Sequence, residues 1–142
     1  MRLALAEARK AEAEDEVPVG AVVVVDGEVI ASEHNRREQL QDPTAHAELL
    51  ALRTASAALG TWRLTNAVLY VTLEPCPMCA GAAVAARLGG VVFGAADYKG
   101  GACGSLYNLC SDPRLNHELA VTPGVLEEES ATVLKEYFLP RR

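Results

Sequence analysis

The spacing of hydrophobic and polar positions changes several times along the chain, and each pattern predicts one element. The first 13 residues are rich in Ala, Leu, Glu and Arg, which favour a helix. Residues 19–25 form a β-branched apolar run that is typical of a buried strand. Asp26-Gly27 follows, which is a strong hairpin signal, and a second strand is expected over 28–32. These two strands should therefore pair antiparallel.

Helical spacing of leucines predicts a second helix over residues 45–59, with Asp42 or Thr44 as its cap and Gly60 as its stop. The remaining pattern predicts a strand over 66–73, a helix over 75–86, a strand over 91–95, a Gly-rich loop over 97–108, a short strand over 118–122 and a final helix over 126–138.

Strands that alternate with helices favour an α/β fold. Strand–helix–strand crossovers require parallel pairing, so we expect a mixed sheet of about five strands with helices on both faces. Sites in such folds form outside the carboxyl ends of strands, beside helix N-termini. The chain shows no internal repeat or linker, and its 142 residues are typical of one domain spanning 1–142.

The composition of the chain excludes several classes of protein. Half of the residues are hydrophobic and only 5% are aromatic, so the core must consist mostly of Ala, Val and Leu. No apolar run approaches the roughly 20 residues that cross a bilayer, so no membrane partner is expected. No export signal is visible, which favours a cytoplasmic location where thiols stay reduced. A net charge of −6 argues against a protein that coats nucleic acid nonspecifically.

Two short motifs, His46-Ala47-Glu48 and the stretch PCPMC at 75–79, each open a predicted helix. Cys76 and Cys79 are three residues apart, so both sulfurs face one side of the helix, whose N-terminus favours thiolates. Together with His46 they make three zinc ligands. Structural zinc sites close with four protein ligands, whereas three leave a position open and are typical of catalysis.

Glu48 lies too close to His46 in sequence to share its direction, so it is a poor ligand but suits proton exchange with water. Without a metal, Cys76 and Cys79 could instead form a redox CxxC pair, and His46 could be a solvated loop residue. A structural zinc knuckle would need a second CxxC, and a redox pair would not need the HxE triplet, so one catalytic Zn²⁺ per chain is predicted. Cys103 and Cys110 match no ligand spacing and are expected to be buried or half-exposed thiols.

The order HAE, then PCPMC some thirty residues later, resembles the signature of the zinc-dependent nucleoside and nucleobase deaminases. The resemblance covers almost the whole chain and is strongest to the bacterial tRNA-specific adenosine deaminases. The stretches DPTAHAE and EPCPMC also look like guanine and cytosine deaminases, so they indicate only the reaction class. The loop FGAADYKGGACGSLYNL and the tail GVLEEESATVLKEYFLPRR resemble the tRNA enzymes specifically.

This resemblance implies a three-layer α/β/α cytidine deaminase-like fold with zinc on His46, Cys76 and Cys79. It implies that Glu48 shuttles protons while adenosine becomes inosine at the wobble position of a tRNA anticodon stem-loop. A homodimer is expected as well. Two other functions stay open, namely a free-base deaminase acting on guanine or cytosine, and an inactive deaminase fold that serves as a binding subunit.

The resemblance also suggests substrate contacts. Asn35 matches a residue that hydrogen-bonds the base, and Val19 and Ala47 would line the pocket. Asp97 and Lys99 match a loop that contacts flanking nucleotides. Without a role in binding, Asn35 would be an ordinary turn residue, and Asp97 and Lys99 would belong to a solvated charged loop. The remaining expectations are phosphate contacts at Arg36, Arg141 and Arg142, a helix ended early by Pro140, and surface hydrogen-bonding roles for His34 and His117.

Overall fold

The computed structural model describes residues 1–141, and its elements follow the predicted order closely. The helices are α1 (Arg2–Ala13), α2 (Arg37–Leu40), α3 (Ala47–Leu59), α4 (Pro77–Ala85) and α5 (Glu127–Phe138), with short 3₁₀ helices η1 (Leu109–Ser111) and η2 (Leu139–Arg141). The strands are β1 (Gly20–Val25), β2 (Glu28–His34), β3 (Ala67–Leu73), β4 (Gly90–Ala95) and β5 (Ala120–Thr122).

The five strands form one mixed sheet in the order β2-β1-β3-β4-β5. β1 pairs antiparallel with both β2 and β3, whereas β3, β4 and β5 run parallel. The β1–β2 hairpin turns at Asp26 and Gly27, whose φ angles are 51° and 77°. Positive φ at both central residues is the geometry that matches the strand twist, which confirms the predicted turn.

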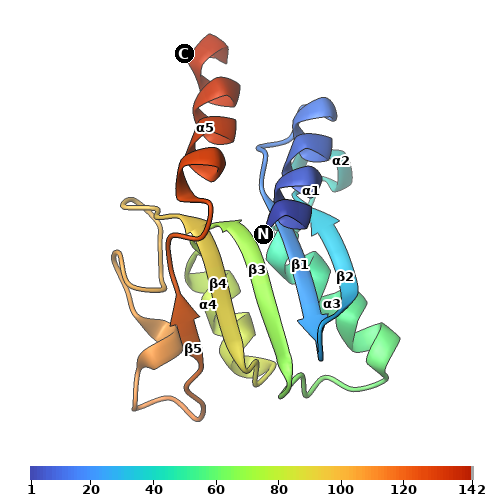
Figure 1. The fold of residues 1–142 in the computed structure, drawn as a ribbon, viewed down its shortest axis with the longest axis vertical. Coiled ribbons are helices and arrows are strands. Elements are labelled where there is room, and N and C mark those ends of the chain that lie inside the picture. Colours follow the sequence, from blue (N-terminus) through green and yellow to red (C-terminus); the bar gives the residue numbers. More distant parts are fainter. Residues whose placement is uncertain (142) are drawn as a thin grey trace.

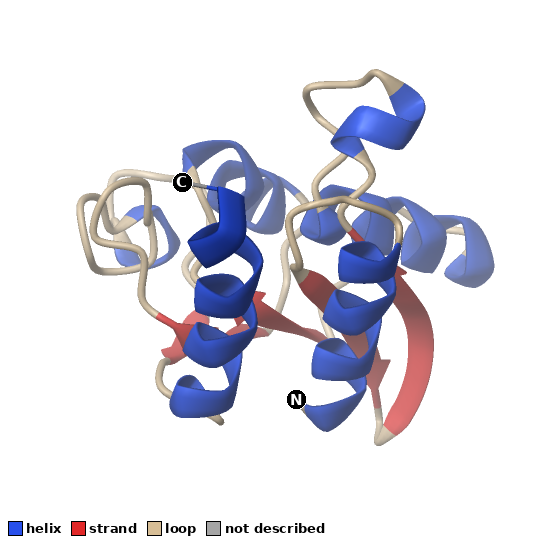
Figure 2. Ribbon diagram, turned by 90° about the horizontal axis from the view of Figure 1, so that it is seen from above, coloured by secondary structure: helices blue, strands red, loops and turns tan. Residues whose placement is uncertain are grey.

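Helices cover both faces of the sheet (Figure 1). Seen from above, α1 and α5 lie on one side of the sheet, and α3 and α4 lie on the other (Figure 2). This arrangement is the predicted three-layer α/β/α fold. Among the described residues, no helix is both long and apolar enough to cross a membrane.

The core is built from small side chains, as the composition predicts. Its fully buried members are mostly Ala, Val and Leu, and Phe93 is its one aromatic residue. Small side chains let elements pack closely. A Cβ at Gly20 would lie 1.9 Å from the Ala4 carbonyl oxygen, so only glycine lets α1 rest against the start of β1.

The start of α3 differs from the prediction. Asp42 does not cap the helix, because its Oδ1 accepts hydrogen bonds from the Thr44 backbone N–H (2.8 Å) and hydroxyl (2.7 Å). Those contacts form a separate turn, so the helix begins later, at Ala47, with His46 at its N-cap. Because the helix starts later than predicted, His46 is not in its first turn but at its N-cap. At the other end of the chain, α5 stops at Phe138, before Pro140 as predicted.

Candidate active site

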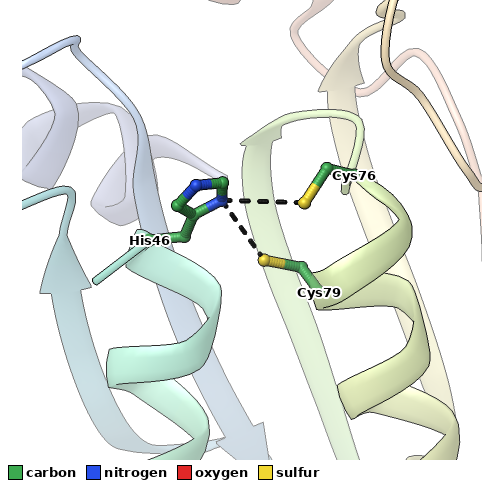
Figure 3. Close-up of side chains that lie close together, drawn as sticks. All are labelled: His46, Cys76 and Cys79. Carbon is green, nitrogen blue, oxygen red and sulfur yellow. Dashed lines mark hydrogen bonds between the residues drawn. The ribbon is translucent and has the colours of Figure 1, made fainter. Parts of the chain in front are cut away.

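The three predicted metal ligands come together at the ends of two helices. His46 is the N-cap of α3, Cys76 is the N-cap of α4, and Cys79 lies one turn into α4 (Figure 3). The His46 Nδ1 atom lies 3.7 Å from the Cys76 Sγ and 3.5 Å from the Cys79 Sγ. Pro77 at the first position of α4 needs no hydrogen-bond partner for its nitrogen, which suits this helix start.

This donor set fits a tetrahedral zinc ion. The ligand atoms of the three side chains lie within 4.8 Å of one another. Zinc–sulfur bonds of about 2.3 Å and a zinc–nitrogen bond of about 2.05 Å at tetrahedral angles place nitrogen and sulfur about 3.6 Å apart. The observed distances of 3.5 and 3.7 Å agree with that separation. Little rearrangement is therefore needed to bind a metal.

The local electrostatics favour a thiolate. Hydrogen bonds from the Cys79 thiol and the His46 ring outweigh burial and lower the pKa of Cys76 to about 4. The same contact, together with burial, raises the pKa of Cys79. The Cys76 thiolate in turn raises the pKa of His46. Both helix N-termini add partial positive charge at this point.

Glu48 is the buried acid of the site. It lies in the first turn of α3, and its side chain is only 4% exposed. Burial raises its pKa, because the charged form loses its water shell. A carboxyl group with a raised pKa binds a proton more readily than a free carboxylate does, which suits a general acid and base.

A cavity of about 150 Å³ collects most of the predicted site residues. Its lining includes Val19, Asn35, His46, Ala47, Glu48, Cys76 and Asp97. It lies outside the carboxyl ends of β3 and β4 and beside the N-termini of α3 and α4, which is where the fold class predicts a site. Lys99 does not line it and is exposed.

Asn35 lies at the cavity with its side chain partly committed. Its amide nitrogen donates to the Val17 carbonyl oxygen (3.2 Å), and its Oδ1 accepts from the Arg37 backbone N–H (3.3 Å). Each end of the amide makes one hydrogen bond and retains the capacity for another. The turn role and the pocket position of Asn35 are therefore compatible.

Glu74 is a lining residue that the sequence reasoning missed. It is 2% exposed and accepts hydrogen bonds from the loop that carries Asp97. Burial alone would raise its pKa, but the hydrogen bonds from Ser105 and from backbone N–H groups outweigh burial and lower it. A signal was available, because an acidic residue that ends a buried apolar strand needs partners.

Arg36 and Arg141, two of the predicted phosphate contacts, do not line the cavity. Arg36 is half-buried, and its Nε atom is buried. The Arg141 guanidinium stacks over the Tyr137 ring at 3.7 Å and donates to the Tyr137 carbonyl oxygen. The backbone N–H of Lys99 donates to Asp97 Oδ1, which leaves its ammonium exposed. Arg142 lies outside the described residues.

The sequence also led to expectations for two further histidines and two further cysteines. The prediction of a surface position is wrong for His34, which is 4% exposed. Its ring nitrogens meet the carboxylates of Glu7, in α1, and of Glu14, at the C-cap of α1. His117 is half-buried and donates to the Leu88 carbonyl oxygen. Cys103 and Cys110 are buried free thiols, as predicted, with their sulfurs 3.6 Å apart.

Comparison with known proteins shows to which family the chain belongs. The model of the MafB19-like deaminase family matches residues 1–142. The tRNA-specific adenosine deaminase of Bacillus subtilis (strain 168) is 56% identical over 138 residues, which cover 97% of this chain and 86% of that protein. The tRNA-specific adenosine deaminase of Agrobacterium fabrum is 51% identical over 142 residues, which cover 100% of this chain and 93% of that protein.

Solved structures agree. A structure from biochemical and structural studies of A-to-I editing by tRNA:A34 deaminases superposes with a TM-score of 0.91 and 52% identity, covering 94% of this chain and 97% of that chain. A guanine deaminase from Nitrosomonas europaea gives a TM-score of 0.81 at 27% identity, with coverage of 94% and 80%. With a family model over its whole length and relatives above 50% identity, the chain belongs to the MafB19-like deaminases and, within them, to the tRNA-specific adenosine deaminases.

Proposed function

We propose that this chain catalyses the hydrolytic deamination of adenosine to inosine at the wobble position of a tRNA anticodon. The observation that carries the proposal is the meeting of His46, Cys76 and Cys79 beside the buried Glu48, in a chain 56% identical to a tRNA-specific adenosine deaminase. The first three residues supply a metal site and the fourth supplies an acid–base group. Deamination by water needs both.

The proposed cofactor is one Zn²⁺ per chain, held by His46, Cys76 and Cys79. Two thiolates and one neutral imidazole balance its charge. The chemistry that a bound zinc ion supplies is the acidification of water. Three ligands without a fourth protein donor suit that role better than a purely structural one.

Glu48 moves the protons of the reaction. Its carboxylate takes a proton from the attacking water as the water oxygen bonds to C6 of adenine. The carboxyl group then gives that proton to N1 of the base. A second proton passes the same way to the amino group, the C6–N6 bond breaks, and ammonia leaves. One residue thus acts in turn as base and acid, and its burial keeps bulk water from competing for these protons.

The proposed base pocket uses Val19, Asn35 and Ala47. Val19 offers an apolar wall, and the Asn35 amide retains one donor and one acceptor for the edge of a base. The target base must leave its stack to enter. An anticodon loop is already single-stranded, so extrusion costs less there than in a duplex.

The proposed partner is therefore a tRNA anticodon stem-loop. Because the chain carries a net charge of −6, long-range attraction to RNA is weak. Affinity should come from a few local contacts, with Asp97 and Lys99 on the loop after β4, the half-buried Arg36 after β2, and the exposed Arg141 near the C-terminus. Few phosphate contacts give a shallow dependence of affinity on salt.

A homodimer is also proposed, with the face between α3 and α4 as the interface. This face is apolar and hollowed, and Trp62 on it is 55% exposed. Ala82, Ala85 and Ala86 on α4 let a second copy approach closely. Sedimentation at micromolar concentration should give a dimer, and a purely monomeric species would refute the proposal.

The test of function is inosine formation in a purified stem-loop. A stem-loop with adenosine at the wobble position should yield inosine, and a control with adenosine moved to another loop position should not. Free guanine and cytosine serve as competing substrates. Ammonia release from a free base without inosine in any stem-loop would favour a free-base deaminase. Absence of turnover on every substrate, with stem-loop binding intact, would favour a binding subunit.

A further inference from the structure

Glu74 connects the metal-bearing helix to the loop that borders the cavity. It follows β3 directly and precedes Pro75 and Cys76. Its carboxylate accepts the Asp97 backbone N–H at 3.1 Å on one oxygen. The other oxygen accepts the backbone N–H groups of Cys103 and Ser105, each at 3.0 Å. The Ser105 hydroxyl donates to the first oxygen, the one that accepts the Asp97 N–H. All four donors belong to one loop, residues 97–105, which we name the rim loop.

The rim loop and the carboxylate depend on each other. The rim loop contains no helix or strand, so its inward-facing N–H groups lack regular partners. A carboxylate that is 2% exposed needs hydrogen bonds to offset its lost hydration. Hydrogen bonds to an ionised group are shorter and stronger than neutral ones. The carboxylate therefore acts as the internal support on which the loop folds.

The packing of Gly101 against Glu74 also indicates that the rim loop depends on this carboxylate. A Cβ at Gly101 would lie 2.3 Å from the Glu74 carboxyl carbon, well inside the closest approach of real atoms. Only glycine lets the rim loop close over the carboxylate. The next residue, Ala102, donates its backbone N–H to the Pro75 carbonyl oxygen at 2.8 Å. The loop is thus attached to the junction that leads into the α4 metal ligands.

The anchored loop presents the residues that face incoming RNA. Asp97 lines the cavity, and its Oδ1 accepts the backbone N–H groups of Lys99 and Gly100 at 3.0 and 3.1 Å. Lys99 follows two residues after the lining residue Asp97, and it is exposed. Glu74 also borders the cavity, but both of its carboxylate oxygens accept hydrogen bonds from the rim loop. Its influence on the substrate is therefore expected to pass mainly through the loop.

We propose that Glu74 is a positioning residue for the RNA substrate: it holds the rim loop so that Asp97 and Lys99 meet the nucleotides that flank the target adenosine. The inference rests on the proposed function for the identity of the substrate. If the proposal holds, loss of the hydrogen bonds between Glu74 and the rim loop, which we call the anchor, affects binding of the stem-loop more than the chemical step. The metal ligands keep their own positions on α3 and α4, so metal content should not change.

Two variants disturb the anchor from its two sides. Glu74→Gln keeps the shape of the side chain, removes its charge and turns one acceptor into a donor that faces loop donors. Gly101→Ala leaves Glu74 intact and drives a methyl group into its carboxylate. Each should raise KM for an anticodon stem-loop by about 10- to 100-fold, the loss expected when hydrogen bonds to a buried charge are broken, while kcat changes far less. The double variant should be no worse than either single variant, because both break one contact.

Glu28→Gln is the matched control. It removes the same charge at the exposed start of β2, at the opposite end of that strand from the cavity, and should leave KM unchanged. Amide hydrogen exchange gives a readout that needs no turnover. The amides of Asp97, Cys103 and Ser105 should exchange faster in Glu74→Gln, while those of α3 and α4 stay protected.

An unchanged KM together with faster loop exchange would overturn the proposal, because the loop would then be loose without consequence for RNA. Loss of zinc and of kcat at constant KM would also overturn it and assign Glu74 to the metal site. If Glu74→Gln fails to fold, Gly101→Ala and its stem-loop Kd decide the question. A wild-type chain that forms no inosine refutes the proposed function, whereas the stem-loop Kd and the amide exchange still report on the anchor.

Discussion

Replacing His34 by alanine should weaken the fold by removing the connection between α1 and the end of β2. The His34 Nδ1 lies 2.8 Å from a Glu7 carboxylate oxygen, and its Nε2 lies 2.9 Å from a Glu14 oxygen. Glu7 also accepts hydrogen bonds from Lys10 and Ser32. His34 is the last residue of β2 and directly precedes Asn35, so the network supports one wall of the cavity.

The two contacts differ in strength because they differ in burial. The side chains of His34 and Glu7 are 5% and 9% exposed, so this contact should contribute about 1.5–3 kcal/mol, as hydrogen bonds to charged groups do. Glu14 is 41% exposed, so solvent screens its contact to about 0–1 kcal/mol. The expected loss in the free energy of unfolding is therefore about 1.5–4 kcal/mol. At roughly 3 °C per kcal/mol for a chain of this length, Tm should fall by about 5–12 °C.

Thermal unfolding followed by far-UV circular dichroism at pH 7 measures this loss. Arg114→Ala is the control, because its ion pair with Asp112 lies at the surface and should shift Tm by less than about 1 °C. A fall in Tm of less than about 2 °C for His34→Ala would refute the reasoning, since it would mean that the buried contact contributes no more than a surface pair.

The pH dependence gives a second check. Burial would raise the pKa of Glu7, but hydrogen bonds from His34, Lys10 and Ser32 outweigh it and lower that pKa from 4.5. A lowered pKa contributes stability that is fully present above the unfolded value and is lost as pH falls through the folded value. The Tm difference between the wild type and His34→Ala should therefore shrink as the pH falls below about 4.

Three further variants test the site. Cys79→Ala should abolish the single zinc equivalent that elemental analysis is expected to find in the wild type, and retained zinc would contradict the ligand assignment. Glu48→Gln should keep its zinc but lose about 10²–10⁴-fold in kcat, because proton transfer is lost while the ligands remain, and loss of zinc would make Glu48 a ligand instead. Lys99→Ala should weaken stem-loop binding and reduce the slope of log K against log salt by about 0.7, the value for one phosphate contact on a single strand, and an unchanged slope would remove Lys99 from the interface.

Local patterns predicted most elements and the metal ligands. The β1–β2 turn needs only Asp26 and Gly27, whose positive φ angles are properties of those two residues. The spacing of Cys76 and Cys79 places both sulfurs on one side of any helix that begins there. His46 opens the preceding helix, so the three ligands required only that two helix N-termini meet. That meeting is a general feature of sheets with parallel crossovers.

The errors arose where the polar atoms of a side chain found other hydrogen-bond partners than the predicted ones. His34 was expected at the surface, but Glu7 and Glu14, which are 27 and 20 residues away in sequence, make it a buried residue. Asp42 or Thr44 was expected to cap α3, but these two residues bond to each other before the helix begins, and His46 is its N-cap. In both cases the residue type was suited to the predicted role, and competition for its polar atoms decided otherwise.

The sequence by itself determined the α/β class, the β1–β2 turn and the residue types of the metal site, because each depends on chemistry within a few neighbouring positions. Only the tertiary structure decided which polar groups support the cavity. Glu74 receives its donors from residues 23 to 31 positions away, and no periodic pattern marks such a pairing. Burial of a charge creates a demand for partners, and the sequence shows the charge but not the donors, which the folded chain alone brings within 3.1 Å.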